Sequence, residues 1–195
     1  MPRTNIAYSN PWTAEQFLAW AATQEGRYEF DGSRPVAITG STALHGRIVV
    51  NTHVALRARL RGTPCSAFGP DLGVRTIGDA VRYPDVLVTC AKFEEMERLA
   101  PDARVVFEVL SADSGRRDQI EKIREYGAVP STLHYGIVES AGVGLLVLHR
   151  ERGDDAWTAL ALTGGDTLRL PEIGVEIPVG EFYEDVDFGD NAAGG

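Results

Sequence analysis

The sequence has few cysteines and no long hydrophobic run. No stretch of about 18 consecutive apolar residues occurs, which excludes a transmembrane helix. The N-terminal residues also lack the apolar segment of a signal peptide. The only two cysteines, Cys65 and Cys90, stand in neither a CxxC nor a Cys/His zinc spacing. We therefore predict reduced, buried thiols in a cytoplasmic protein with no membrane partner.

Several familiar catalytic signatures are also missing. The sequence contains no GxSxG, HExxH, Walker or Rossmann motif, which argues against the enzyme classes that these motifs mark. Its hydrophobic content of 44% and charged content of 24% are typical of a globular protein. A length of 195 residues predicts a single domain, 1–195, with an acidic tail at 186–195 that frays.

The net charge of −9 is unevenly distributed along the chain. Residues 151–195 contain 11 acidic and 2 basic residues, whereas residues 1–150 contain 17 of each. The acidic excess therefore lies entirely in the C-terminal quarter. A neutral remainder with local arginine clusters is compatible with a nucleic-acid partner, although it is poorer support than a basic surface.

Two short apolar runs each contain one carboxylate. Asp85 lies in the run 83–90 and Glu108 in the run 104–111, and both runs have the composition of buried strands. Burying an ionised carboxylate costs several kcal/mol unless it is paired or bound to a metal. A helix follows directly and contains Lys122, one of only two lysines in the chain. An aspartate, a glutamate and a lysine around one strand end predict a metal-dependent hydrolytic site.

Each of these residues also has a structural explanation. Asp85 could be an exposed residue at the start of a strand, and Glu108 could be a buried partner of Arg104. Lys122 lies four residues after Asp118, so the two could form a surface ion pair on one helical face. The apolar neighbours of Glu108 favour a functional role for it, and the two carboxylates together favour a functional Lys122.

The periodicity predicts a mixed α+β protein. An amphipathic helix is expected at 12–22 and a hairpin at 28–39 that turns at Asp31-Gly32. A longer helix is expected at 42–61, and a further helix at 114–126 should bury Ile120 and Ile123. Ser111, Asp113 and Ser114 have the side chains that cap such a helix. The expected strands are 66–76, 81–89, 104–110, 133–139, 145–149 and 157–162, the last two paired with each other.

This order of elements and motifs resembles the PD-(D/E)XK nuclease superfamily. Within it, the chain is most similar to a bacterial family of restriction-endonuclease-like proteins that was formerly a domain of unknown function. The resemblance spans about 13–182 and rests on the following ordered set: 27–32 (RYEFDG), His45, Pro84-Asp85, 108–111 (EVLS), Arg117-Asp118, Lys122 and Tyr126. One position departs from the superfamily pattern, because Leu110 stands where its lysine would be. In this family the lysine often comes from the following helix, which makes Lys122 the candidate.

The resemblance implies a restriction-endonuclease-like α/β core at about 42–140. An N-terminal helix-hairpin and a C-terminal β extension would flank that core. By analogy, Asp85, Glu108 and the Val109 backbone carbonyl hold Mg²⁺, or Mn²⁺, and Lys122 acts on the attacking water. Glu29, His45 and Asp118 are candidate supporting residues. For Glu29, an exposed position in the hairpin is an equally good interpretation, and for His45 a solvent-facing place in the first turn of the helix.

The implied activity is magnesium-dependent endonucleolytic hydrolysis of DNA phosphodiester bonds. Cutting both strands needs two sites, which implies a homodimer. The candidate phosphate-binding residues are Arg47, Arg57, Arg61, Arg116 and Arg117. Leu110 and the lack of a basic surface leave an alternative open. In that alternative the chain is a catalytically inactive module on the same fold that binds nucleic acid or protein.

Overall fold

The computed structural model describes residues 12–110 and 115–188. The predictions for Ser111, Asp113, Ser114 and the tail from 189 onward therefore lie outside the described residues. The helices are α1 (Ala14–Ala21), α2 (Ala43–Arg59) and α3 (Arg116–Gly127), with 3-10 helices η1 (Ile77–Asp79), η2 (Pro171–Ile173) and η3 (Val179–Tyr183). The strands are β1 (Arg27–Phe30), β2 (Pro35–Ile38), β3 (Ser66–Phe68), β4 (Val74–Arg75), β5 (Val81–Arg82), β6 (Val86–Thr89), β7 (Ala103–Val109), β8 (His134–Val138), β9 (Leu145–His149), β10 (Thr158–Leu162), β11 (Thr167–Leu170) and β12 (Val175–Pro178). None of the described helices is long and apolar enough to cross a membrane.

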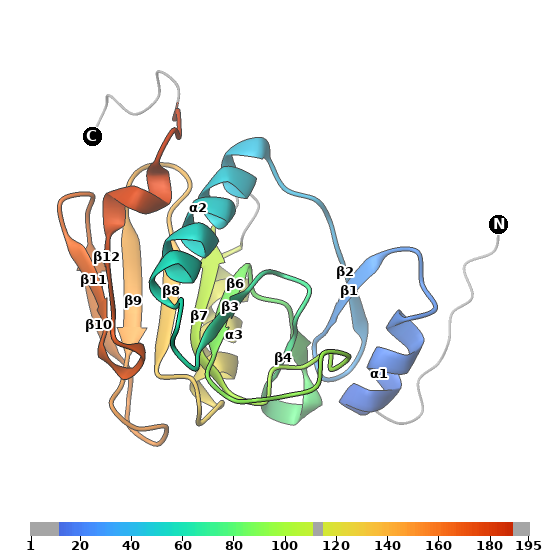
Figure 1. Cartoon of the computed structure of the whole chain (residues 1–195). Coiled ribbons are helices and arrows are strands. Elements are labelled where there is room, and N and C mark those ends of the chain that lie inside the picture. Colours follow the sequence, from blue (N-terminus) through green and yellow to red (C-terminus); the bar gives the residue numbers. More distant parts are fainter. Residues whose placement is uncertain (1–11, 111–114, 189–195) are drawn as a thin grey trace.

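A six-stranded mixed sheet forms the centre of the molecule. Its strand order is β10-β9-β8-β7-β6-β3, and only β7 and β8 are parallel. Parallel neighbours need a crossover, and α3 supplies it between β7 and β8. Helix α2 covers one face of the sheet through Ile48 and Leu56, and α3 covers the other through Tyr126 (Figure 1). The predicted mixed α+β fold is confirmed.

The N-terminal helix and hairpin join two later strands. Strands β1 and β2 pair as predicted, and β1 also pairs with β5 in a second sheet of order β2-β1-β5-β4. Helix α1 packs on this sheet, where the rings of Phe17 and Phe30 stack at 5.3 Å between centroids. The hairpin is therefore fixed against the segment that leads into Asp85.

Two of the expected strands are each divided between the sheets. The range 66–76 splits into β3 and β4, and the range 81–89 splits into β5 and β6. The second break falls at Pro84, which has no backbone N–H to continue a ladder. Asp85 consequently lies where the chain passes from one sheet to the other.

The C-terminal strands extend the main sheet and then cover α2. Strand β10 pairs with β9 along its whole length, as predicted. Strands β11 and β12 form a hairpin whose Leu168 and Ile177 share the α2 side of the core with Phe182 of η3.

Helix α3 has a different phase from the predicted one. Ile120 is 60% exposed, so the expectation that it is buried is wrong, whereas Ile123 is half-buried against the sheet. The face turned to the sheet is set by Tyr126 and Glu125, which are buried. Six residues separate Ile120 from Tyr126, and this spacing places them about 120° apart around the helix.

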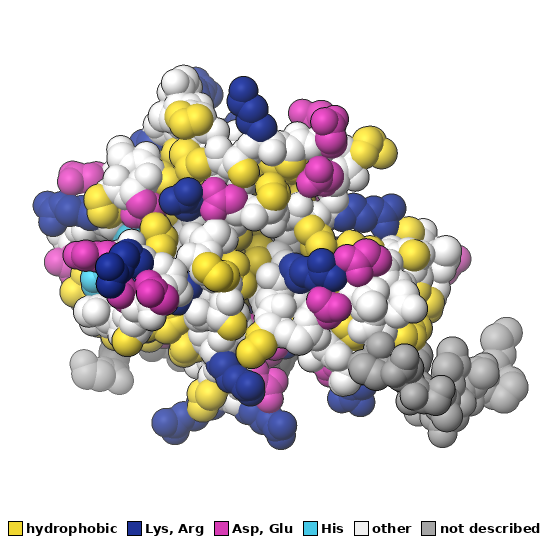
Figure 2. Space-filling model, turned by 90° about the horizontal axis from the view of Figure 1, so that it is seen from below, with side chains coloured by type: hydrophobic (Ala, Val, Ile, Leu, Met, Phe, Trp, Pro, Cys, Tyr) yellow, Lys and Arg dark blue, Asp and Glu magenta, His cyan; other side chains and the backbone are white. Residues whose placement is uncertain are grey.

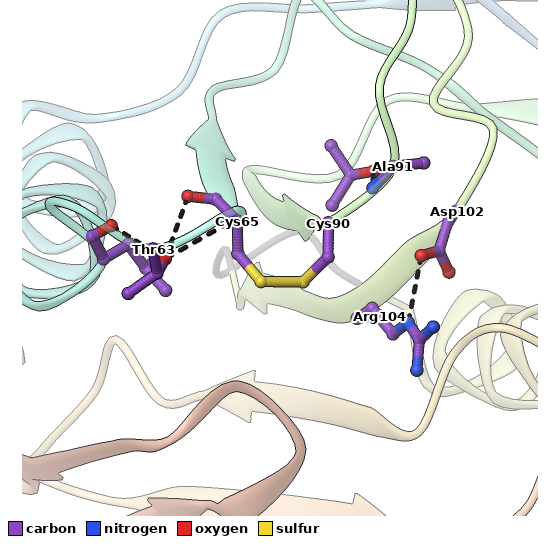
Figure 3. Close-up of a disulfide and its surroundings, with 8 residues drawn as sticks. Thr63, Cys65, Cys90, Ala91, Asp102 and Arg104 are labelled. Carbon is purple, nitrogen blue, oxygen red and sulfur yellow. Dashed lines mark hydrogen bonds and ion pairs between the residues drawn. A yellow bond between two sulfur atoms is a disulfide. The ribbon is translucent and has the colours of Figure 1, made fainter.

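The expectation of reduced thiols is also wrong, because Cys65 and Cys90 form a disulfide (Figure 3). The physical reason is the strand register, which pairs Ser66 of β3 with Thr89 of β6. One residue further along, Cys65 and Cys90 face each other across the same two strands. They are 25 residues apart in sequence, so their spacing gave no sign of the contact.

Reduction of this disulfide should destabilise the protein. A cross-link between residues 25 apart restricts the unfolded chain and is expected to contribute about 3 kcal/mol to the free energy of unfolding. We expect urea denaturation with and without reductant to differ by roughly 2–4 kcal/mol. The Cys65→Ser/Cys90→Ser variant should match the reduced protein and ignore the reductant. Equal stability of the oxidised and reduced protein would contradict this prediction.

Candidate active site

Asp85, one residue before β6, lies beside Glu108 of the neighbouring strand β7. The antiparallel register pairs Val86 of β6 with Phe107 of β7, so Asp85 stands beside Glu108 one residue further on. Phe107 and Val109 pack on the α2 side of the sheet, and the alternation of a strand turns Glu108 toward α3. The sequence predicted the two carboxylates on adjacent strands; the structure places Glu108 in β7 and Asp85 one residue before β6.

Glu108 is buried, with 9% of its surface exposed, and both oxygens have partners. Lys122 Nζ lies 3.0 Å from Oε2, and the Tyr126 hydroxyl donates a hydrogen bond of 2.9 Å to Oε1. Burial is the main cause that raises the pKa of Glu108 to about 7. The nearby charges of Asp85 and Glu29 raise this pKa further, and the Lys122 cation offsets the rise only in part. The alternative partner Arg104 instead pairs with Asp102 at 2.9 Å.

Lys122 projects from α3 toward Glu108. Its amine is 3.0 Å from Glu108 and 3.9 Å from Asp118, and 16% of its side chain is exposed. Burial lowers the pKa of Lys122, but the charges of Glu108, Glu29 and Asp118 outweigh burial and raise it above the ordinary value. Lys122 is therefore a cation at neutral pH.

His45 belongs to the same cluster. The Thr42 hydroxyl caps α2 by accepting a hydrogen bond of 3.2 Å from the His45 backbone N–H. The His45 imidazole then lies with Nε2 3.1 Å from the Val109 carbonyl oxygen and 3.4 Å from Asp85 Oδ2. Its hydrogen bond to Asp85 raises the pKa of His45 despite partial burial. The Asp85 carboxylate also accepts a hydrogen bond of 2.8 Å from the Val109 N–H.

Glu29 is held at the cleft by a buried network that the sequence did not reveal. Arg82 donates to Glu29 at 3.0 Å and, through Nη2, to Glu125 at 2.7 Å, and the Tyr83 N–H donates to Glu29 at 3.1 Å. Only 5% of the Arg82 side chain and 13% of that of Glu29 are exposed, so the exposed hairpin position considered for Glu29 is wrong. Glu125 precedes the family motif residue Tyr126, but no sequence pattern linked it to Arg82.

These side chains line one cleft of about 920 Å³. It lies between the hairpin, the start of α2 and the first two turns of α3. The acidic residues on its wall are Glu29, Asp85, Glu108 and Asp118, and the basic ones other than His45 are Arg27 and Lys122. Carboxylates therefore outnumber arginine and lysine, which suits a divalent cation better than a bare phosphate.

The arginines predicted to bind phosphate are not among the residues that line this cleft. Arg57 follows His45 by 12 residues, which places it about 18 Å further along α2, and Arg61 lies just past the end of the helix. Arg117 is exposed in the first turn of α3 and pairs with Glu121 at 2.9 Å. On the face shown in Figure 2, lysines and arginines alternate with acidic side chains and form no continuous basic area.

Comparison with known proteins identifies the family to which this fold belongs. The model of the family Uma2, described as "Putative restriction endonuclease", matches residues 14–180. The chain belongs to this family.

Two individual proteins extend the comparison. An uncharacterized protein of Synechocystis sp. is 27% identical over 176 residues, covering 89% of this chain and 92% of its own. A crystal structure from Anabaena variabilis, described as a putative nuclease belonging to DUF820, superposes with a TM-score of 0.69 at 15% identity. The superposition covers 89% of this chain and 98% of the Anabaena chain, and the similarity is one of fold.

Proposed function

We propose that the chain is a magnesium-dependent endonuclease that hydrolyses phosphodiester bonds of DNA. The observation that carries the proposal is the group of Asp85, Glu108 and Lys122 at one strand end. Its members come from the residue before β6, from β7 and from α3, and they line one cleft. Asp85 and Glu108 are the residues that we expect to hold the metal, and Lys122 is the proposed catalytic cation.

The donor chemistry fits a hard divalent cation. Two carboxylates and the Val109 carbonyl offer only oxygen, which Mg²⁺ and Mn²⁺ prefer. Among residues 12–110 and 115–188, no group of three or more His, Cys, Asp or Glu side chains could hold a metal ion by itself. Mg²⁺ commonly uses one or two carboxylates and keeps several waters, so a two-carboxylate site suits it. The Val109 carbonyl has two lone pairs and can keep its contact with His45 while it binds a cation.

Each side chain then has a separate role. A bound divalent cation would neutralise phosphate charge and lower the pKa of a coordinated water. Lys122, held protonated by its acidic neighbours, would stabilise charge that develops on the phosphate and orient the attacking water. A protonated lysine is no base, so we assign it electrostatic stabilisation rather than deprotonation of the water. Tyr126 fixes the Glu108 carboxylate, and His45 fixes Asp85.

The metal ligands should be measurable without any substrate. We expect calorimetric titration with Mg²⁺ to show binding to the unaltered protein. Glu108→Gln should weaken it at least about tenfold, the effect of losing about 1.4 kcal/mol of ligand interaction. Glu97→Gln, which changes an exposed glutamate outside the cleft, is the matched control and should bind as the unaltered protein does.

The same titration has a predictable pH dependence. Protons and the cation compete for Glu108, whose pKa is raised to about 7. Affinity should therefore fall as the pH is lowered through about 7 and should level off above it. In Glu108→Gln this pH dependence should be largely lost. Binding that ignores both the substitution and the pH would remove Glu108 from the metal site.

A further inference from the structure

The outer face of α2 is basic and apolar in an otherwise acidic protein. We define this face by Arg47, Val50, Val54 and Arg57 of α2, which follow one another at helical spacing within an arc of about 80°, and by Arg61 just past the end of the helix. The helical part of the face is about 15 Å long. The valines are 58% and 61% exposed, and α2 contains no aspartate or glutamate.

The arginines of this face have no ion-pair partner among the residues that the structure describes. The neighbouring Arg59, by contrast, forms a two-pronged pair with Glu181 of η3 at 2.7 and 2.9 Å. The two valines lie one helical turn apart and form one small apolar area, and the residue type that flanks it, arginine, is enriched at protein interfaces.

An acidic segment lies directly beside this basic face. Residues 184–187 follow η3, and Glu184, Asp185 and Asp187 are exposed. Asn51, at the edge of the α2 outer face, holds the segment in place by donating to the Phe182 carbonyl at 3.2 Å and the Glu184 carbonyl at 2.8 Å. Figure 1 shows η3 and the segment after it alongside α2.

We propose that the α2 outer face and segment 184–187 together form a two-fold interface with a second copy of this chain. A two-fold axis repeats the same surface on both partners, so a basic area beside an acidic one is complementary to itself. Each copy's arginines lie over the other copy's acidic segment, and the valines meet between them. The two α2 helices cross at an angle, because antiparallel alignment would bring Arg47 against the partner's Arg57.

A second copy fits this surface better than a nucleic acid does. A phosphate backbone on the arginines would lie next to Glu184 and Asp185 and would be repelled by them. It would also leave Val50 and Val54 without an apolar contact. This inference goes beyond the proposed catalytic activity and does not depend on it.

Substitutions that change the charge of either half of the interface test the proposal. Sedimentation velocity of the full chain, without metal or nucleic acid, should show a dimer that weakens as salt is added. Arg57→Glu/Arg61→Glu should be monomeric, and so should Glu184→Lys/Asp185→Asn. Asparagine is chosen at 185 because Asp185 has a φ of 55°, which asparagine tolerates. Arg152→Glu, on an exposed turn away from this surface, should dimerise as the unaltered chain does.

The decisive sample is an equimolar mixture of the two monomeric variants. In a mixed dimer, the carboxylates introduced on α2 of one variant meet the amine introduced in the acidic segment of the other. At the second contact, the unchanged α2 arginines meet an unchanged acidic segment, as they do in the dimer of the unaltered chain. The mixture should therefore associate at least about tenfold more tightly than either variant alone.

Three outcomes would overturn the proposal. One is an unaltered chain that is monomeric at all concentrations, and another is a mixture of the two variants that stays monomeric. The third is the finding that Arg57→Glu/Arg61→Glu loses DNA binding but sediments unchanged, since the face would then be a nucleic-acid surface.

Discussion

Lys122→Met should slow DNA cleavage by about 10²–10³-fold and leave the fold and both metal-binding carboxylates in place. Methionine keeps the length of the side chain but removes the charge that lies 3.0 Å from Glu108. Loss of a positioned cation that stabilises developing negative charge typically lowers the rate by about 10²–10³-fold. The rate should be measured as nicking and linearisation of plasmid DNA with Mg²⁺. The circular dichroism spectrum should be unchanged.

Lys92→Met is the matched control, because Lys92 is the only other lysine and is exposed outside the cleft. Its cleavage rate should equal that of the unaltered chain. Removal of the Lys122 cation leaves Glu108 buried among carboxylates, so its pKa should rise further above 7, and Mg²⁺ binding should need a higher pH. Cleavage at the unaltered rate in Lys122→Met with Mg²⁺ bound would show that another group performs the reaction. Absence of cleavage in both lysine variants and the unaltered chain would instead favour the inactive module.

The main residues of the cleft were predictable because burial of a charge is visible in the sequence. Glu108 is surrounded by valines and phenylalanine, and that pattern alone indicates a carboxylate that needs a partner. Lys122 stood out through the scarcity of lysine in the chain. The register of β6 and β7 then brings Asp85 to Glu108 without any further requirement, since both strands are short and buried.

Contacts between distant segments were not predictable in this way. Arg82 lies 53 residues from Glu29 and 43 from Glu125, and nothing in the local pattern of either strand or helix signals their meeting. The disulfide was missed for the same reason, because the register of an edge strand decides which cysteines face each other. The phase of α3 was misjudged because the polar residues that face the sheet, Lys122 and Glu125, do so for electrostatic reasons that hydrophobic periodicity does not detect.

The buried network around Arg82 should be a major contributor to stability. Arg82 is 4% exposed and joins Glu29 of β1 to Glu125 of α3, so it ties the N-terminal hairpin to the main sheet. Burial lowers the pKa of Arg82, but its hydrogen bond to Glu125 and the charges of both glutamates more than compensate and raise it. Without Arg82, two carboxylates would remain in a poorly solvated place with no cation between them.

Arg82→Met should therefore lower the free energy of unfolding at neutral pH by about 3–5 kcal/mol, the usual effect of removing one partner from a buried ion pair. For a chain of this length, that loss corresponds to a fall in melting temperature of roughly 6–20 °C by calorimetry.

The control is Arg75→Met. Arg75 also contacts two acidic residues, Glu15 and Asp79, but its side chain is 43% exposed, so the expected loss is below about 1 kcal/mol. Equal losses of unfolding free energy in the two arginine variants would show that burial does not increase the contribution of the Arg82 network to stability. The packing of Phe17 and Phe30 would then be what holds the hairpin in position.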